Sequence, residues 1–336
     1  MGMEWYVLRR IAWAVVATWI GVTLAFGLWT AAPNPGADAA AAQAAAQGLD
    51  PEQARERYLE RRGLNRPVHV RYMDYMEDIA TFDWGYSISE EQPVTEVIEE
   101  GWVYSAQYFI PAILISIVFG YGIGLYTALN QYSISDYAGS FIAYFGISIP
   151  NFWFAIMLIL VFGVWTSDAE LFGISLDWIN FRTYYQTDFP TWSLRNARQL
   201  VLPVIVLSTA SVASQMRYSR TQALEYARTD FVKTARAKGA SDWRVLTRHI
   251  FRVALVPLST ILIVQVLAVL FAGSFVIEQI FQIPGLGVKY LDAISQNDTR
   301  LLLVMTLIPI FIAVIGNLLQ DLAYVFLDPR IDYGDR

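Results

Sequence analysis

The chain has 336 residues, of which 55% are hydrophobic and only 16% charged, and it carries a net charge of −6 and no cysteine. Soluble domains usually have about 25% charged residues, so this composition excludes an ordinary soluble protein and indicates one that spans a membrane. The lack of cysteine excludes disulfides, iron–sulfur clusters and thiolate-bound metals.

Apolar stretches long enough to cross a bilayer recur along the chain. A bilayer core about 30 Å thick needs about 20 residues of helix. Five charge-free runs satisfy this length, and a sixth, residues 199–216, is shorter but can extend. We therefore expect an all-α membrane protein with six transmembrane helices. The five long runs are residues 11–32, 101–135, 137–167, 253–277 and 301–320.

The distribution of basic residues predicts the orientation of these helices. Residues 217–252 contain nine Lys or Arg against three acidic residues, and Arg9 and Arg10 precede the first run. Basic residues near span ends favour the cytoplasmic side. We therefore expect both termini and residues 217–252 to be cytoplasmic in a multi-pass protein of the plasma membrane. The first run is too long for a usual signal peptide and lacks a clean cleavage site, so we expect it to stay as a span.

The segment after the first span is predicted to be extracellular and helical. Residues 39–46 form an alanine-rich tract, residues 51–62 a charged helix, residues 63–67 a break and residues 70–82 a further helix. Residues 33–101 contain six Arg and fourteen acidic residues. This acidity indicates either a docking surface for a partner or adaptation to salt.

A second segment predicted to be extracellular, residues 168–198, is rich in aromatic side chains. An aromatic belt at the membrane interface accounts for this composition. A loop that contacts a solute or a partner is the alternative. The residues concerned are Trp178, Phe181, Tyr184, Tyr185, Phe189 and Trp192.

Sites for catalysis or nucleotide binding are missing from the sequence. It has no Gly-x4-Gly-Lys-Ser/Thr phosphate loop, no His-Glu-x2-His and no Gly-x-Ser-x-Gly. The two histidines, His69 and His249, are too few for an ordinary zinc site. We therefore expect neither an enzyme nor a bound cofactor or metal, and no nucleic acid as partner.

Two acidic residues lie near the ends of predicted spans. Glu278 closes the fifth run and Asp321 lies late in the sixth. Because charge inside a bilayer is costly, such residues mark an interface position, a structural ion pair, or a solute or proton pathway. An interface position or a structural ion pair would explain these two residues without a role in transport.

The most ordered block is the basic segment between the fourth and fifth runs. A short helix pattern is interrupted at Gly239, and Ser241 is a suitable N-cap for a second helix. That helix has an apolar side and a basic side, so it fits either a groove of another protein or an anionic membrane surface. The apolar side holds Trp243, Val245, Leu246, Ile250 and Phe251, and the basic side Arg244, Arg248 and Arg252.

This block resembles the cytoplasmic loop of permeases from ATP-binding-cassette (ABC) importers, in particular the dipeptide, oligopeptide and nickel branch. The general loop begins Glu-Ala-Ala-x3-Gly, whereas here Lys233 and Thr234 take the first two positions. The loop of the dipeptide, oligopeptide and nickel branch resembles this block more than the general loop does. Its residues implied to couple to the ATPases are Thr234, Ala235, Arg236, Ala237, Lys238, Gly239, Arg244, His249 and Pro257.

Further motifs extend the resemblance over nearly the whole chain. They include Arg9-Arg10, residues 63–67, residues 83–87, Ile283-Pro-Gly-Leu-Gly287 and the C-terminal residues. The aspartate usual after the first span and the basic residues usual after the second are absent here. The motif residues, implied to serve gating or structure, are Asp83, Gly85, Glu278, Phe281, Pro284, Gly285, Gly287, Asn317, Asp321, Asp328, Pro329 and Arg330.

The resemblance implies a type I ABC importer permease fold and a role in import. Expected partners are a homologous second permease, two cytoplasmic ABC ATPases, an extracellular solute-binding protein and membrane lipid. It divides the chain into residues 1–100, a permease domain of residues 101–328 and a tail of residues 329–336. Two alternatives remain: a secondary transporter driven by an ion gradient, which favours ionisable groups at mid-membrane, and an intramembrane enzyme.

Overall fold

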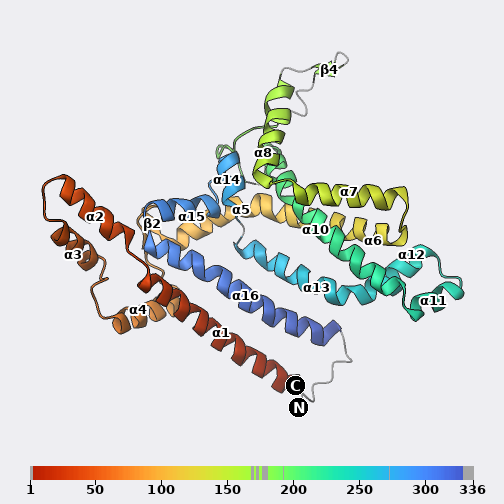
Figure 1. Ribbon diagram of the computed structural model, residues 1–336, viewed down its shortest axis with the longest axis horizontal. Coiled ribbons are helices and arrows are strands. Elements are labelled where there is room, and N and C mark those ends of the chain that lie inside the picture. The colour runs from red at the N-terminus through yellow and green to blue at the C-terminus, as the bar shows by residue number, and fades with distance from the viewer. Residues whose placement is uncertain are drawn as a thin grey trace. The chain divides into compact units, whose positions relative to one another are not determined.

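A computed structural model describes residues 3–167, 170–171, 174–175, 181–191, 193–271 and 273–327. The described chain is mostly helical (Figure 1), in agreement with the expected fold class. Two short antiparallel hairpins pair β1 (Tyr86–Ser87) with β2 (Gln92–Pro93) and β3 (Glu170–Leu171) with β4 (Ile174–Ser175). Motif residues Asp328, Pro329 and Arg330 and the aromatic residues Trp178 and Trp192 lie outside the described residues.

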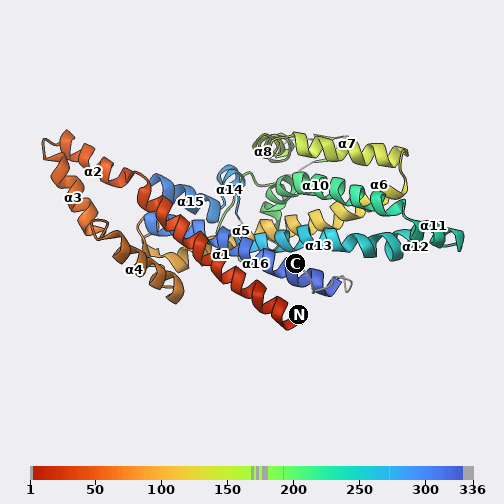
Figure 2. The ribbon, with the colours of Figure 1, turned by 60° about the horizontal axis from the view of Figure 1, so that its bottom comes forward.

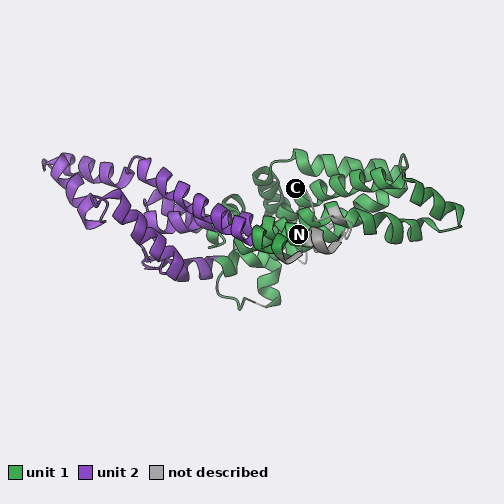
Figure 3. Ribbon diagram, turned by 90° about the horizontal axis from the view of Figure 1, so that it is seen from below, with its two compact units in different colours: residues 1–10, 102–288, 316–336 green, residues 11–101, 289–315 purple. Residues whose placement is uncertain are grey.

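The chain forms two compact units, each built from segments that are distant in sequence (Figure 3). The first comprises residues 1–10, 102–288 and 316–336, and the second residues 11–101 and 289–315. Four of the described helices have residues in both units: α1 (Met3–Ala31), α5 (Val94–Ile115), α15 (Leu286–Ser295) and α16 (Thr299–Leu327).

The second unit contains the helical segment expected after the first span. It forms α2 (Pro35–Ala46), α3 (Pro51–Arg61) and α4 (Val68–Thr81), so the predicted helices and the break between the last two are confirmed. Asn34 and Asp50 start α2 and α3 as N-caps, each followed by a proline at the first helical position, where no N–H is needed.

The core of the second unit joins α4 to α1 and α16. Phe26 of α1 packs on Tyr72 and Tyr75 of α4, with ring centroids 5.3 and 5.2 Å apart. Val22 and Leu307 complete this buried cluster. The outer helices are therefore held by side-chain packing against the membrane-type helices of the same unit.

The first unit contains the remaining helices. Several α-helices continue directly into π-helical turns, which are rare and often mark functional positions. The elements are η1 (Ser116–Gly120), α6 (Tyr121–Leu129), α7 (Ile134–Ser148), α8 (Asn151–Ile159), η2 (Leu160–Val164), η3 (Trp165–Ser167), α9 (Leu194–Gln199), α10 (Val201–Ala227), α11 (Asp230–Ala237), α12 (Asp242–Arg244), η5 (Val245–Ile250), α13 (Phe251–Ala268), η6 (Val269–Phe271) and α14 (Phe275–Phe281).

Helix α10 is the central helix of the first unit and contacts α6, α7, α8 and α13 (Figures 1 and 2). Glycines allow the close approach, because a Cβ at Gly124 would meet Ser219 and the backbone of Met216. A Cβ at Gly120 would likewise meet Gln215, whereas Gly122 faces open space. Gly120 and Gly124 therefore serve close packing of the helix against α10, and Gly122 does not.

An ion pair fixes α7 to α10. Arg220 of α10 donates from Nε to Oδ1 of Asp136 at 2.7 Å and from Nη2 to Oδ2 at 2.8 Å. The Asp136 side chain is buried and also accepts the backbone N–H of Tyr132. A two-pronged contact of this kind holds both groups in one geometry.

The predicted spans appear with differences. Among the described residues, three helices are long and apolar enough to cross a membrane, and the number rises to five if two bent helix pairs count as one span each. The run expected as one helix over residues 137–167 bends by 99° between α7 and α8. The bend lies at Ile149 and Pro150, because a residue before proline is driven into extended backbone, as the ψ of 124° at Ile149 confirms.

Candidate functional site

The basic block singled out from the sequence folds into an elbow, defined here as residues 230–250. Helix α11 ends at Ala237, the chain turns at Gly239, and α12 begins after Ser241 (Figure 1). The Ser241 hydroxyl accepts the N–H of Arg244 at 3.4 Å, so the predicted N-cap is confirmed.

The turn of the elbow ends α11 with a Schellman motif. The N–H of Ala240 donates to the carbonyl of Ala235 at 3.1 Å, and the N–H of Gly239 to that of Arg236 at 2.9 Å. Gly239 has a φ of +80°, a left-handed conformation that costs a residue with a Cβ about 1–2 kcal/mol. A Cβ there would meet nothing within 4 Å, so glycine serves the backbone turn and not close packing within the chain.

One side of the elbow is buried against the chain's own helices. Val232 and Ala235 of α11 and Val245 and Leu246 of η5 are all less than 10% exposed. They form one apolar cluster with side chains of α6 and α10. The apolar side expected to enter a groove of a partner is thus largely occupied within the chain, because those residues complete a core at the ends of two long helices.

The other side of the elbow is exposed and mainly basic. Of two small residues implied to couple to the ATPases, Gly239 is exposed and the Ala235 side chain is buried. Trp243 is 71% exposed and projects from this side of the elbow. Between residues 234 and 244 the exposed positions are Thr234, Arg236, Ala237, Lys238, Gly239, Ser241, Asp242, Trp243 and Arg244.

Charge pairs on the exposed side are weak. Arg236 lies 3.5 Å from Asp242 across the turn, and Lys233 lies 2.8 Å from Asp230 within α11. Exposed pairs of this kind contribute roughly 0–1 kcal/mol, because water screens them. Their charges therefore remain available to an external partner.

The elbow leads into the next predicted span through a bend. His249 is half-buried in η5. The helical path from Asp242 to Phe271 bends by 65° directly before Pro257. Proline lacks the N–H that continues the helical ladder and its ring displaces the preceding turn, which accounts for the bend.

Glu278 forms a second candidate site in the first unit. Its carboxylate is 0% exposed and accepts the Ser105 hydroxyl at 2.7 Å and the Tyr108 hydroxyl at 2.8 Å. The backbone N–H groups of Ser274 and Val288 donate to it at 3.3 and 3.0 Å. The salt bridges among the described residues do not include Glu278, so it lies neither at an exposed interface nor in an ion pair, the two simple alternatives from the sequence. Hydrogen bonds satisfy the carboxylate, because α5 supplies two hydroxyl donors and the loop around Glu278 supplies two backbone N–H groups.

The motif glycines beside Glu278 leave room for its carboxylate. A Cβ at Gly285 would meet Ser105 and the Glu278 carboxyl carbon, and a Cβ at Gly287 would meet the backbone of Phe275. Pro284 directly precedes Gly285 in the loop. Phe281 is buried in the adjoining apolar cluster. The motif from Glu278 to Gly287 is therefore a compact loop closed around one buried carboxylate.

The motif of residues 83–87 lies in the second unit and is fixed by Asp298. This carboxylate is 0% exposed and accepts the hydroxyls of Ser87 and Ser89 and the backbone N–H groups of Ile88 and Ser89, at 2.6 to 3.0 Å. It also caps α16 through the N–H of Leu301. Asp83 is exposed, and Gly85 turns the chain with a φ of +78°.

Burial and hydrogen bonding act in opposite directions on Asp298. Burial raises its pKa, but hydrogen bonds from Ser87, Ser89 and Leu301 outweigh burial and hold the pKa below its usual value. The carboxylate is therefore charged at neutral pH. Lys289 and Glu90 form a further, largely buried pair at 2.6 Å nearby.

The last motif residues lie on α16. Asp321 pairs with Arg10 of α1 at 3.0 Å, which is the structural ion pair considered from the sequence. Asn317 is exposed.

A family profile matches residues 120–333, a range that includes α10, the elbow, α13 and the Glu278 loop. The profile describes the binding-protein-dependent transport system inner membrane component. The chain belongs to this family. It is therefore a membrane component of a transport system, and the resemblance stated from its motifs is confirmed.

Curated relatives of this family member match over nearly the full length. The oligopeptide transport system permease protein AppB of Bacillus subtilis is 33% identical over 98% of the chain and 100% of its own length. The di/tripeptide transport system permease protein DppB of Pseudomonas aeruginosa is 32% identical over 97% and 98%. The dipeptide permease DppB of Bacillus subtilis is 35% identical over 80% of each chain.

Sequence reasoning missed several residues that organise these sites in the permease homologue. Asp298 gave one usable signal, an aspartate at the residue before a helix start. Ser105 and Tyr108 gave none, because they meet Glu278 only through tertiary contacts 173 and 170 residues apart in sequence.

Proposed function

We propose that this chain is the permease subunit of an ATP-driven importer of the ABC type. It forms half of a translocation pathway for peptides or similar small solutes. The support is membership of the transport family together with relatives named as oligopeptide and dipeptide permeases that match over nearly the full length. The observation that carries the coupling role is the exposed basic side of the elbow.

The proposed topology has six transmembrane helices in a type I importer permease fold. Helix α10 supplies the remaining span, the fourth in chain order. It has 27 residues, and its charged residues lie toward one end, which suits a helix that projects beyond the membrane. With both termini and the elbow cytoplasmic, α2, α3 and α4 are extracellular. The proposed division is residues 1–100, the permease domain 101–328 and the tail 329–336.

The proposed partners follow from the surfaces left free. A homologous second permease completes the pathway, and two ATPases dock on the elbows from the cytoplasm. In the proposed coupling, Gly239 sets the turn, and Trp243 and Arg244 face the partner. The coupling residues are those implied by the family resemblance: Thr234, Ala235, Arg236, Ala237, Lys238, Gly239, Arg244, His249 and Pro257. Closure of the ATPases then moves the elbow together with α6 and α10, on which it packs.

A solute-binding protein is proposed to dock on the outer segment. Hydrogen bonds from Ser87 and Ile88 to Asp298 anchor the end of this loop, and Asp83 at its start is exposed to a partner. Deleting residues 39–47 should leave transport largely intact, whereas changing residues 83–87 should impair it. No observation favours the alternative of an ion-gradient-driven transporter, since hydrogen-bond donors already satisfy Glu278.

A reconstituted complex tests the proposed function directly. This chain, its partner permease, the ATPases and the binding protein are assembled in liposomes, and uptake of labelled peptides is measured with and without ATP. We expect uptake only with ATP and with all subunits. Uptake driven by an ion gradient in the absence of the ATPases would overturn the proposal.

A further inference from the structure

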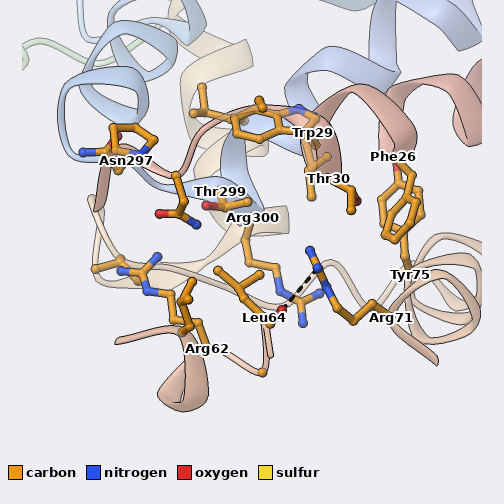
Figure 4. A pocket seen from close by; sticks show the side chains of 18 of the residues that line it. Phe26, Trp29, Thr30, Arg62, Leu64, Arg71, Tyr75, Asn297, Thr299 and Arg300 are labelled. Carbon is orange, nitrogen blue, oxygen red and sulfur yellow. Dashed lines mark hydrogen bonds between the residues drawn. The ribbon is translucent and has the colours of Figure 1, made fainter. Parts of the chain in front are cut away.

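A cavity of about 730 Å³ lies within the second unit, beside the end of α1 (Figure 4). Its walls come from the last turn of α1, the turn between α3 and α4, helix α4 and the start of α16. Figure 4 shows Arg62, Arg71 and Arg300, from three separate segments, around the same space. The motif of residues 63–67 contributes Gly63, Leu64 and Arg66 to its wall, and no role has been assigned to that motif above.

The lining of the cavity is strongly basic. Five arginines and two aspartates line it, which leaves three positive charges in excess; these residues are Arg61, Arg62, Arg66, Arg71 and Arg300, with Asp74 and Asp78. Arg66 pairs with Asp74 at 2.5 Å, and Arg300 pairs with Asp78. In the described part of the chain no salt bridge includes the other three arginines. The cavity thus holds guanidinium groups that lack an anion.

Arg71 donates to the Leu64 carbonyl and Arg62 lies over the Tyr58 ring, whereas two hydroxyl groups in the same lining lack hydrogen-bond partners among the described residues. Tyr75 is only 8% exposed, and within the described residues neither its hydroxyl nor that of Thr30 has a hydrogen-bond partner. Buried polar groups nearly always have one. Arginines and free hydroxyl donors around one space are the groups that bind an oxyanion, and the planar guanidinium matches phosphate in particular.

The position of the cavity favours a phosphate carried by a lipid. The end of α1 and the start of α16 meet here, and both helices are long and apolar enough to span a membrane, so the cavity lies where two spans reach the interface. Trp29, a typical interfacial side chain, forms part of its wall. Leu24 and Leu28 on the last turns of α1 are 61% and 73% exposed and offer an apolar surface for acyl chains.

We propose that this cavity binds the phosphate of an anionic phospholipid headgroup. The arginines contact the phosphate, the hydroxyls of Tyr75 and Thr30 donate to its remaining oxygens, and the acyl chains lie along α1. Basic pockets between membrane helices on the cytoplasmic side bind anionic headgroups, and the pairing of guanidinium with phosphate is the same at the outer end of α1. A zwitterionic headgroup binds less well, because its cation meets the excess positive charge.

The test is lipid retention by the full chain in its complex, measured by native mass spectrometry. The complex is exposed to equal amounts of phosphatidylglycerol and phosphatidylcholine, and inorganic phosphate is offered in a separate arm. We expect preferential retention of phosphatidylglycerol, and about a tenfold or greater loss of that preference in the double variant Arg62→Gln/Arg71→Gln. Retention without preference, or binding of inorganic phosphate without retained phosphatidylglycerol, overturns the proposal.

Two further variants separate a lipid site from a general effect of charge or folding. Arg57→Gln removes one positive charge from exposed α3 outside the cavity, where Arg57 bonds only Gln53, and should leave the preference unchanged. Tyr75→Phe keeps the ring in the core and removes only the free hydroxyl, so it should fold and weaken retention severalfold. Either of two results contradicts the proposed site. One is a loss of lipid preference in Arg57→Gln as large as in the double variant, and the other is full lipid retention in both Tyr75→Phe and the double variant.

Discussion

The Ser87 hydroxyl donates a 2.6 Å hydrogen bond to the Asp298 carboxylate, across 211 residues of sequence. Together with the N–H groups of Ile88 and Ser89, it ties the loop after the outer helices to the start of α16. Because the carboxylate is fully buried, it has no water to replace a lost donor.

Asp298→Asn should therefore lower the free energy of unfolding of the second unit by about 2–4 kcal/mol, since an amide cannot accept this set of donors. Thermal unfolding of the purified full chain measures the loss. Glu77→Gln on the exposed side of α4 is the control and should change little. Similar unfolding curves for Asp298→Asn and wild type would contradict the role assigned to the carboxylate.

The same aspartate predicts a pH dependence. Its pKa is lower in the folded chain than the usual value of about 3.9, so the unfolded state binds its proton first as pH falls. The stability it supplies is complete above about pH 4 and is lost as pH falls through the folded pKa. The difference in stability between wild type and Asp298→Asn should shrink in that acid range and stay constant from pH 5 to 8. A difference that grows in acid would contradict the sign.

Gly239→Leu should uncouple ATP hydrolysis from solute uptake. The left-handed turn costs leucine about 1–2 kcal/mol, and the side chain projects from the exposed side of the elbow. Gly48→Leu is a matched control, since Gly48 has a φ of +71° and equally open space in another part of the chain. Uptake and solute-stimulated ATP hydrolysis are measured on the reconstituted complex. If both variants keep both activities at wild-type level, the elbow is not the coupling element.

Trp243→Ala should weaken ATPase binding by about tenfold or more without loss of stability. An exposed tryptophan amid basic residues is typical of a binding hot spot, and it contributes no core packing here. Binding of purified ATPase to the permease in nanodiscs gives the affinity. Trp19→Ala, at a 53% exposed position of α1, is the control. Equal affinity of both variants would remove Trp243 from the docking surface.

Glu278→Gln should destabilise the loop of residues 274–288. The amide nitrogen cannot accept the Val288 N–H or the hydroxyl donors, and the cost is about 2–3 kcal/mol. The reverse change at the next residue, Gln279→Glu, lies at an exposed position and should be neutral. Limited proteolysis of this loop in the intact chain reports the effect. A loop equally protected in both variants would show that the carboxylate is dispensable.

Arg220→Lys should loosen α7 from α10, because lysine cannot form the two-pronged contact with Asp136. A double-mutant cycle with Asp136→Asn should give a coupling energy of about 1–3 kcal/mol. Arg217→Lys, one turn away and exposed, is the matched control. Additive effects of the two changes would mean that the pair contributes little to this packing.

Local rules explain what the sequence determined by itself. Composition and apolar length predicted a helical membrane protein, the alanine-rich tract and the charged stretch after it predicted the outer helices, and Gly239 with Ser241 predicted the elbow. Each of these features depends on residues within a few positions of one another. The motif order was sufficient to identify the transport family.

Only the tertiary structure decided which faces of these elements stay free. The elbow helix showed an apolar side in the sequence, but whether Val245 and Leu246 meet a partner or the chain itself depends on where α6 and α10 end. Likewise Glu278 and Asp298 receive their donors from residues 105, 108 and 87–89, far away in sequence. Burial and hydrogen-bond satisfaction are properties of chain segments brought together in space, and periodicity along one segment does not contain them.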